Sequence, residues 1–252
     1  MLGDLAGCAW RALRLWVLAY FEDEAVVPGA VGFIQTVGEL LNWHPHVHLL
    51  VSDGMFDREG TFERFTFFDT QLIEQLFRAE VLRLLMGKGL ICQDIVDNLL
   101  SWRHSGFSVN GDVNVPDRES AARLGRYMIR CPVVLERMLL DEGTGEVLYR
   151  TRPSRADHPE GPVARWDVYE LIGRVLDHLP ASNQQMVRYW GFFCEAALCV
   201  KRELRGLHGL LLATCVKLAS WFSEVLHPSV RAPWVATIVA GAWGVRRGGG
   251  AL

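Results

Sequence analysis

The chain has 252 residues, of which 50% are hydrophobic and 22% are charged, with a formal net charge of −3. This composition suits one large or two small packed domains, excludes disorder as the default state, and gives no global signature of DNA binding. The charge is uneven, because residues 192–252 carry seven Lys or Arg against three Asp or Glu and leave residues 1–191 with a net charge of −7. An acidic core of this kind must concentrate positive charge locally in order to hold a phosphate backbone.

The first part of the chain predicts a mixture of helix and strand. Residues 11–21 read as a helix that turns into a strand at Trp16–Phe21, and after Pro28 and Gly29 the apolar residues of 30–43 recur at helical spacing. Residues 47–51 then predict a strand. Asp53 and Gly54 mark a turn, from which residues 62–68 return as a second strand.

The rest of residues 1–191 continues this alternation of helices and strands. Asp69 and Thr70 begin a helix and Gly87–Gly89 ends it, whereas Pro132 ends a later one. The predicted elements are helices over 70–85, 91–102, 117–130 and 168–179, a strand over 107–115, and a hairpin of strands over 136–140 and 146–150. This order indicates an α+β fold, with an antiparallel sheet and helices packed on one of its faces.

The segment His44-Pro45-His46-Val47-His48 holds the strongest chemical signal in the chain. Residues i and i+2 of a strand share a face, so His46 and His48 project side by side while Val47 is buried on the other face. Two neutral imidazoles on a rigid strand suit a divalent metal. On the spacing alone, a pair of half-buried polar residues on a strand edge is the favoured interpretation, so a metal site needs support from other segments.

Four segments in one order resemble a known family. They are Gly29–Gly38 before the histidines, the histidine segment itself, Ser105–Val109 followed by Arg126–Pro132, and Glu142–Arg150. From about Pro28 to about Gly191 the chain is similar to the rolling-circle insertion-sequence transposases. These are HUH (His-hydrophobic-His) single-strand nucleases and include the common-region elements. The resemblance implies a ferredoxin-like antiparallel sheet, single-stranded DNA at the element ends as partner, and rolling-circle DNA transposition as function.

The resemblance also assigns roles to residues. The family motif places its catalytic tyrosine at Tyr127, on the helix that also carries Arg123, Arg126 and Arg130, three candidates for DNA binding. A phenol with an ordinary pKa near ~10 needs nearby cations or a metal before it can attack phosphorus. Some relatives use two tyrosines four residues apart. Here those positions are Arg123 and Cys131, so the resemblance implies a single-tyrosine enzyme.

His46 and His48 would bind Mg²⁺ or Mn²⁺, which polarises the scissile phosphate. Two ligands are too few, and the third remains open. Asp53 lies five residues beyond His48 and therefore points to the opposite face of the strand. Asn110 is a better candidate if its strand neighbours the histidines, and His44 is a further one.

The family usually carries an N-terminal cysteine-rich zinc module, which this chain lacks. Six cysteines without a C-x-x-C pair, and no secretory signal over residues 1–19, fit reduced thiols in a cytoplasm and no stable membrane association. They are Cys8, Cys92, Cys131, Cys194, Cys199 and Cys215.

We expect three segments. Residues 1–151 form the catalytic domain and residues 152–191 a family-like helical extension. Residues 192–252 form a discordant apolar tail that packs irregularly, consistent with a shifted reading frame. Two alternatives to an active transposase stay open: an inactive transposase remnant, and a single-stranded nucleic-acid-binding protein that does not cut.

Overall fold

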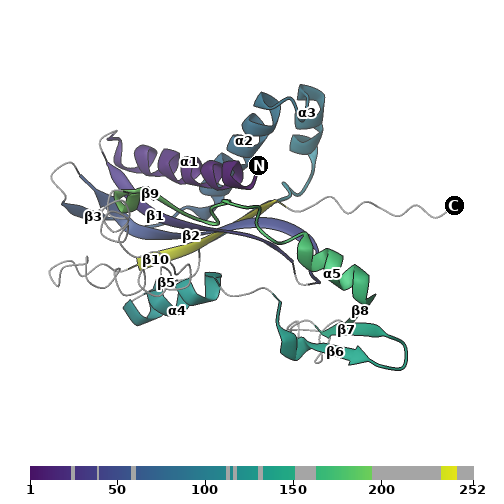
Figure 1. Ribbon diagram of the computed structural model, residues 1–252. Helices are drawn as coiled ribbons and strands as arrows, with labels where there is room; N and C mark the ends of the chain where they lie inside the picture. The colour runs from purple at the N-terminus through teal and green to yellow at the C-terminus, as the bar shows by residue number, and fades with distance from the viewer. Residues whose placement is uncertain are drawn as a thin grey trace. The chain divides into compact units, whose positions relative to one another are not determined.

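The computed structural model describes residues 1–23, 26–38, 40–57, 61–111, 114–115, 118–129, 133–150, 163–194 and 234–242. Within these ranges the chain is an α+β protein with antiparallel sheets and helices, as the sequence predicts (Figure 1). Its contacts divide it into two compact units. The larger contains Met1–Ile34, His46–Ile129 and Gln185–Ala242, and the smaller contains Gln35–Pro45 and Arg130–Gln184.

Helices α2 and α5 each begin at an aspartate that caps them. The Asp69 carboxylate accepts a hydrogen bond from the backbone N–H of Leu72 at 2.9 Å, and Asp167 accepts from the N–H groups of Tyr169 and Glu170. The helices are α1 (Leu2–Phe21), α2 (Thr70–Gly87), α3 (Gln93–Ser101), α4 (Arg118–Ile129) and α5 (Val168–Leu176), with a 3₁₀ turn over Leu135–Arg137.

The larger unit is built on a seven-stranded sheet with the order β4-β10-β2-β1-β9, to which β3 is added on β2 and β5 on β10. The smaller unit has a three-stranded antiparallel sheet, β6-β7-β8. The strands of the larger unit are β1 (Val27–Val37), β2 (Trp43–Phe56), β3 (Phe62–Arg64), β4 (Phe107–Asn110), β5 (Asn114–Val115), β9 (Val187–Gly191) and β10 (Trp234–Ala242). Those of the smaller unit are β6 (Met138–Asp141), β7 (Glu146–Arg150) and β8 (Val163–Asp167).

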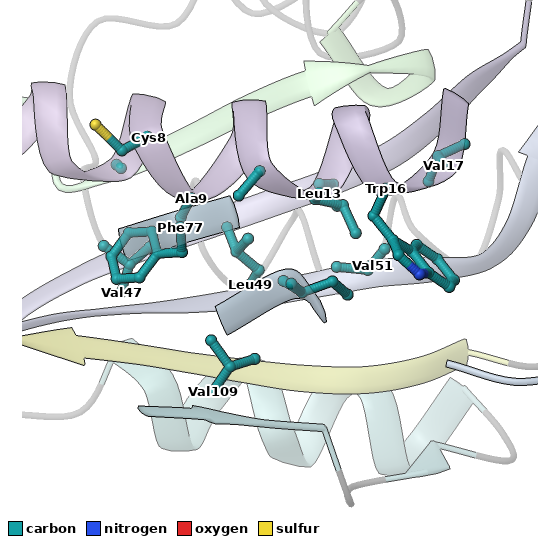
Figure 2. Packing of buried hydrophobic residues seen from close by; sticks show 14 of the residues in the cluster. Cys8, Ala9, Leu13, Trp16, Val17, Val47, Leu49, Val51, Phe77 and Val109 are labelled. Atoms are coloured by element: carbon teal, nitrogen blue, oxygen red, sulfur yellow. The ribbon is translucent and has the colours of Figure 1, made fainter. Parts of the chain in front are cut away.

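Strand β2 is buried on both faces. Val47, Leu49 and Val51 pack with residues of α1 and α2 in the main hydrophobic cluster, as Figure 2 shows. On the other face, Leu50 packs with Met128 of α4 in a second cluster. The prediction that helices cover only one face is therefore wrong. His46, His48 and Ser52 alternate with apolar residues in β2, and such alternation is typical of a strand that is buried on one face only.

Two predictions for the first 43 residues are also wrong. Residues 16–21 continue α1 as helix, because Leu13, Trp16 and Val17 lie on its buried face. Residues 27–37 form strand β1 instead of beginning a helix over 30–43, since their near-continuous burial matches a central strand. An apolar run of this length fits either element when only the spacing is considered.

The sequence suggested a turn at Asp53 and Gly54. This prediction is wrong, because Gly54 lies inside β2. It pairs with Arg64 of β3, and a Cβ atom at this position would lie 2.0 Å from the backbone oxygen of Glu63. The close approach of the two strands therefore requires glycine here.

Residues 234–242 lie in the interior of the sheet. Strand β10 pairs antiparallel with β2 on one side and with β4 and β5 on the other. The prediction that the tail packs irregularly is wrong for these residues, and residues 195–233 and 243–252 lie outside the described ranges. Among the described helices, none is both long and apolar enough to cross a membrane.

Candidate active site on the sheet

His46 and His48 lie side by side on β2. Their ring centroids are 5.0 Å apart with an angle of 70° between the ring planes. The two residues are 9% and 7% exposed, and Val47 between them is fully buried in the main cluster. The alternation of a regular strand thus brings the two imidazoles together on the face opposite α1 and α2.

The environment of His48 keeps its ring neutral at physiological pH. Burial, together with the smaller effect of the neighbouring His46, lowers the pKa of His48 to about 4. A neutral imidazole carries the lone pair that a metal ion requires. His48 therefore has the protonation state of a ligand before any cation binds.

Helix α4, which carries Tyr127, packs against the histidine face of the sheet. Met128 is buried in a cluster with Leu50, and Leu50 lies two residues beyond His48 on the same face of β2. Leu124, one helical turn before Met128, joins the same cluster. The Tyr127 side chain is 45% exposed. The helix that carries Tyr127 and the two histidines thus share one side of the sheet.

The three arginines predicted to bind DNA differ in their surroundings. Arg123 donates to Glu119 at 2.8 Å and to Ser120 at 2.8 Å, so its charge is partly compensated within α4. Arg126, in the last turn of the same helix, is exposed. Arg130 lies outside the described residues. Their DNA-binding role stays a prediction.

The third metal ligand stays open. Asn110 on β4 and His48 on β2 both pair with Val239 of β10, so they lie on one face but two strands apart. Two strand spacings amount to about 10 Å between backbones. His44 lies near the start of β2, within the smaller unit. In the described part of the chain, no three His, Cys, Asp or Glu residues form a group that could hold a metal.

The contribution of β10 to this face was missed by the sequence reasoning. Its Gly241 pairs with His46 on one side and with Ser108 on the other. The run Ala240-Gly241-Ala242 of small residues was the available signal, although nothing in its spacing identifies the partner strand.

Asp53 takes no part in the histidine face. It lies on the opposite face of β2, where its carboxylate is 3.4 Å from Arg64 Nε. Its Oδ1 is buried without a hydrogen-bond partner among the described residues. Burial raises the pKa of Asp53 to about 6, although Arg64 opposes the shift. The ordinary pKa of an aspartate is 3.8, so the folded state favours the protonated carboxyl of Asp53. Keeping Asp53 ionised in the folded state costs free energy, and this cost appears as the pH rises from about 4 to 6.

Asp53→Asn should therefore raise the free energy of unfolding by about 2 kcal/mol at pH 7.5 and leave it almost unchanged at pH 4. Urea unfolding at the two pH values measures the difference. Glu63→Gln, an exposed carboxylate on β3, is the matched control and should change neither value. An equal effect of Asp53→Asn at both pH values would contradict a cost that depends on ionisation.

Comparison with known proteins adds a family and one relative. Residues 29–202 match the model of the Y2_Tnp family, described as "Putative transposase". The chain is also 26% identical over 183 residues to the transposase for insertion sequence element IS801 from Pseudomonas savastanoi pv. phaseolicola. That alignment covers 66% of this chain and 43% of the relative, so the chain spans less than half of the relative's length. No solved structure matches the chain.

Proposed function

Because the chain belongs to this transposase family, we propose that its larger unit nicks and rejoins single-stranded DNA through a covalent tyrosine intermediate. The reaction would serve rolling-circle transposition, with the DNA strand at an element end as substrate. Localisation in the cytoplasm is part of the same proposal. The curated relative is named as the transposase of an insertion sequence, which supports movement of a DNA element as the wider process.

One observation carries the proposal: α4 with Tyr127 packs on the same face of the sheet from which His46 and His48 project. Met128 of α4 and Leu50 of β2 belong to one buried cluster, which supports this arrangement. A strand of DNA lying on this face would meet a nucleophile and two imidazoles together. A tyrosine on the α1 and α2 side would have been separated from the histidines by the sheet.

The proposed reaction exchanges one phosphoester bond for another, so the energy of the broken bond is kept in the ester to tyrosine. The Tyr127 phenolate oxygen attacks the scissile phosphorus, and the bond from phosphorus to the 3′ oxygen breaks. The leaving oxygen takes a proton and becomes a free 3′-hydroxyl, while the 5′ phosphate stays esterified to Tyr127. Attack by a 3′-hydroxyl on this ester reverses the step, so the strand is rejoined without an external energy source.

The residues present suit a divalent cation, although they do not complete its ligand set. Two neutral imidazoles are softer ligands than Mg²⁺ prefers, which favours Mn²⁺ binding in vitro. Such a cation, when bound by His46 and His48, supplies Lewis-acid polarisation of the phosphate. The burial of both rings holds them in place for this role.

The test is incubation of the full chain with end-labelled single-stranded oligonucleotides and Mn²⁺ or Mg²⁺, followed by a denaturing gel. We expect a labelled band at the mass of protein plus DNA, together with a product that ends in a 3′-hydroxyl. Binding without cleavage would favour the single-strand-binding protein, and neither binding nor cleavage would favour the inactive remnant. Cleavage without an adduct would indicate a nuclease that uses water.

A further inference from the structure

A groove of about 500 Å³ lies between α1 and α2. Both helices pack over the face of β2 that carries Val47, Leu49 and Val51 (Figures 1 and 2). The groove is therefore separated by the sheet from His46 and His48. We call it the α1–α2 groove and define it by three residues of each helix, namely Arg11, Arg14 and Leu15 of α1, and Glu80, Arg83 and Leu84 of α2.

The α1–α2 groove has more positive than negative charge. Glu80 is 4% exposed, and its two carboxylate oxygens are bound by different arginines: Arg11 Nε lies 2.6 Å from Oε2, and Arg83 donates to Oε1. Arg14 makes no hydrogen bond or ion pair with any residue that the structure describes. Three guanidinium groups thus face one carboxylate, which leaves two positive charges in excess.

The arginines still have donors to offer. The side chains of Arg11 and Arg83 are 49% and 72% exposed. Arg11 donates to Glu80 and to Cys8, and Arg83 donates to Glu80, so each uses only part of its five N–H groups. Leu15 and Leu84 give the groove an apolar wall beside these donors. A guanidinium fork matches the geometry of a phosphate, and an apolar wall suits the sugar that joins two phosphates.

We propose that the α1–α2 groove binds the phosphate backbone of single-stranded DNA outside the cleavage site. This inference rests on the proposed function. Residues 1–191 carry a net charge of −7 and would repel DNA at long range, so a local positive excess is what a polyanion requires there. Because the groove and the histidine face are on opposite sides of the sheet, a strand has to be long enough to pass around the sheet to occupy both.

Arg14 separates this role from a purely structural one. The pair of Arg11 with Glu80 joins α1 to α2, so replacing Arg11 also disturbs the packing of the helices. Replacing Arg83 leaves one oxygen of the buried Glu80 without this partner. Arg14 is outside that network. Replacing it should remove a positive charge from the groove and leave the fold intact.

The experiment measures fluorescence anisotropy of labelled oligonucleotides of about 8 to 40 nucleotides with the full chain at several salt concentrations. We expect Arg14→Ala to weaken binding of the longest oligonucleotide about fivefold and to lower the slope of log K against log salt by about 0.7. Arg14→Glu should weaken it more, Arg14→Lys should retain most of it, and the shortest oligonucleotide should bind equally to all variants. Lys88→Ala is the matched control, since Lys88 lies directly after α2, pairs with Asp4 at 2.7 Å and is outside the groove. It should bind all lengths like the wild type.

Equal affinity of Arg14→Ala and wild type for the longest oligonucleotide would overturn the proposal. So would unchanged DNA binding accompanied by lost self-association or lost binding of an acidic peptide, which would make the groove a protein-docking site. The adduct on the shortest oligonucleotide tests the proposed chemistry independently. Its absence, with length-dependent binding through Arg14 intact, would refute the cleavage reaction and support the groove.

Discussion

A Tyr127→Phe variant should bind single-stranded DNA with almost wild-type affinity and form no covalent protein–DNA adduct. The substitution removes the hydroxyl oxygen that acts as the nucleophile. If tyrosine is the group that attacks phosphorus, water does not take its place, and the variant should not cleave the strand by hydrolysis. The expected loss of adduct is at least about 10³-fold, the scale on which removal of a catalytic group acts. The fold should be unaffected, because Tyr127 is 45% exposed.

A denaturing gel of labelled oligonucleotide measures the adduct, and anisotropy measures binding on the same samples. Tyr169→Phe serves as the control, since Tyr169 is a highly exposed tyrosine on α5 in the smaller unit. An adduct that persists in Tyr127→Phe would move the nucleophile to another residue. Loss of DNA binding together with the adduct would instead make Tyr127 a binding residue.

The second large effect is expected when both histidines are replaced. His46→Ala with His48→Ala should abolish cleavage and the binding of Mn²⁺, while single-stranded DNA still binds. Both imidazoles are buried and the ring of His48 is neutral, so they are the ligands that the histidine face offers. Because two buried rings also fill space, His46→Gln with His48→Gln is a second variant that keeps more of the side-chain volume.

Isothermal titration with Mn²⁺ measures the metal, and the denaturing gel measures cleavage. His178→Ala provides the control, because His178 belongs to the smaller unit, where its ring nitrogens bond to Thr36 Oγ1 at 3.0 Å and to the Leu41 carbonyl at 3.1 Å. If a folded His46→Gln, His48→Gln protein still cleaves DNA, the reaction does not need a metal ion bound by these two histidines. Lost cleavage with unchanged Mn²⁺ binding would leave the histidines a role in positioning DNA.

The sequence predicted correctly those elements that are determined by residues close together in the chain. Helix α2 follows its capping residue Asp69, α4 lies within the predicted range 117–130, and β6 and β7 pair as the predicted hairpin. The side-by-side placement of His46 and His48 also follows from strand alternation alone. In each case the decisive interactions join residues that are close in sequence.

The errors occur where distant residues decide the structure. Strand β1 has an apolar run that fits either element, and its burial between β2 and β9 decides for strand. The third metal ligand could not be predicted, because the neighbour of β2 is β10, nearly two hundred residues further along the chain. The expected ferredoxin-like arrangement, like the catalytic roles, depends on such long-range placement and stays a prediction.

The position of β10 has a consequence for the order in which the protein folds during synthesis. When residue 194 leaves the ribosome, β2 already has β1 and β3 as partners, but the edge that later binds residues 234–242 is still open. An open, apolar edge invites pairing with another nascent chain, and contacts of such long sequence separation form slowly. The histidine strand therefore gains its last neighbour late in translation, and chaperones that shield nascent edges should have their strongest effect on yield at that stage.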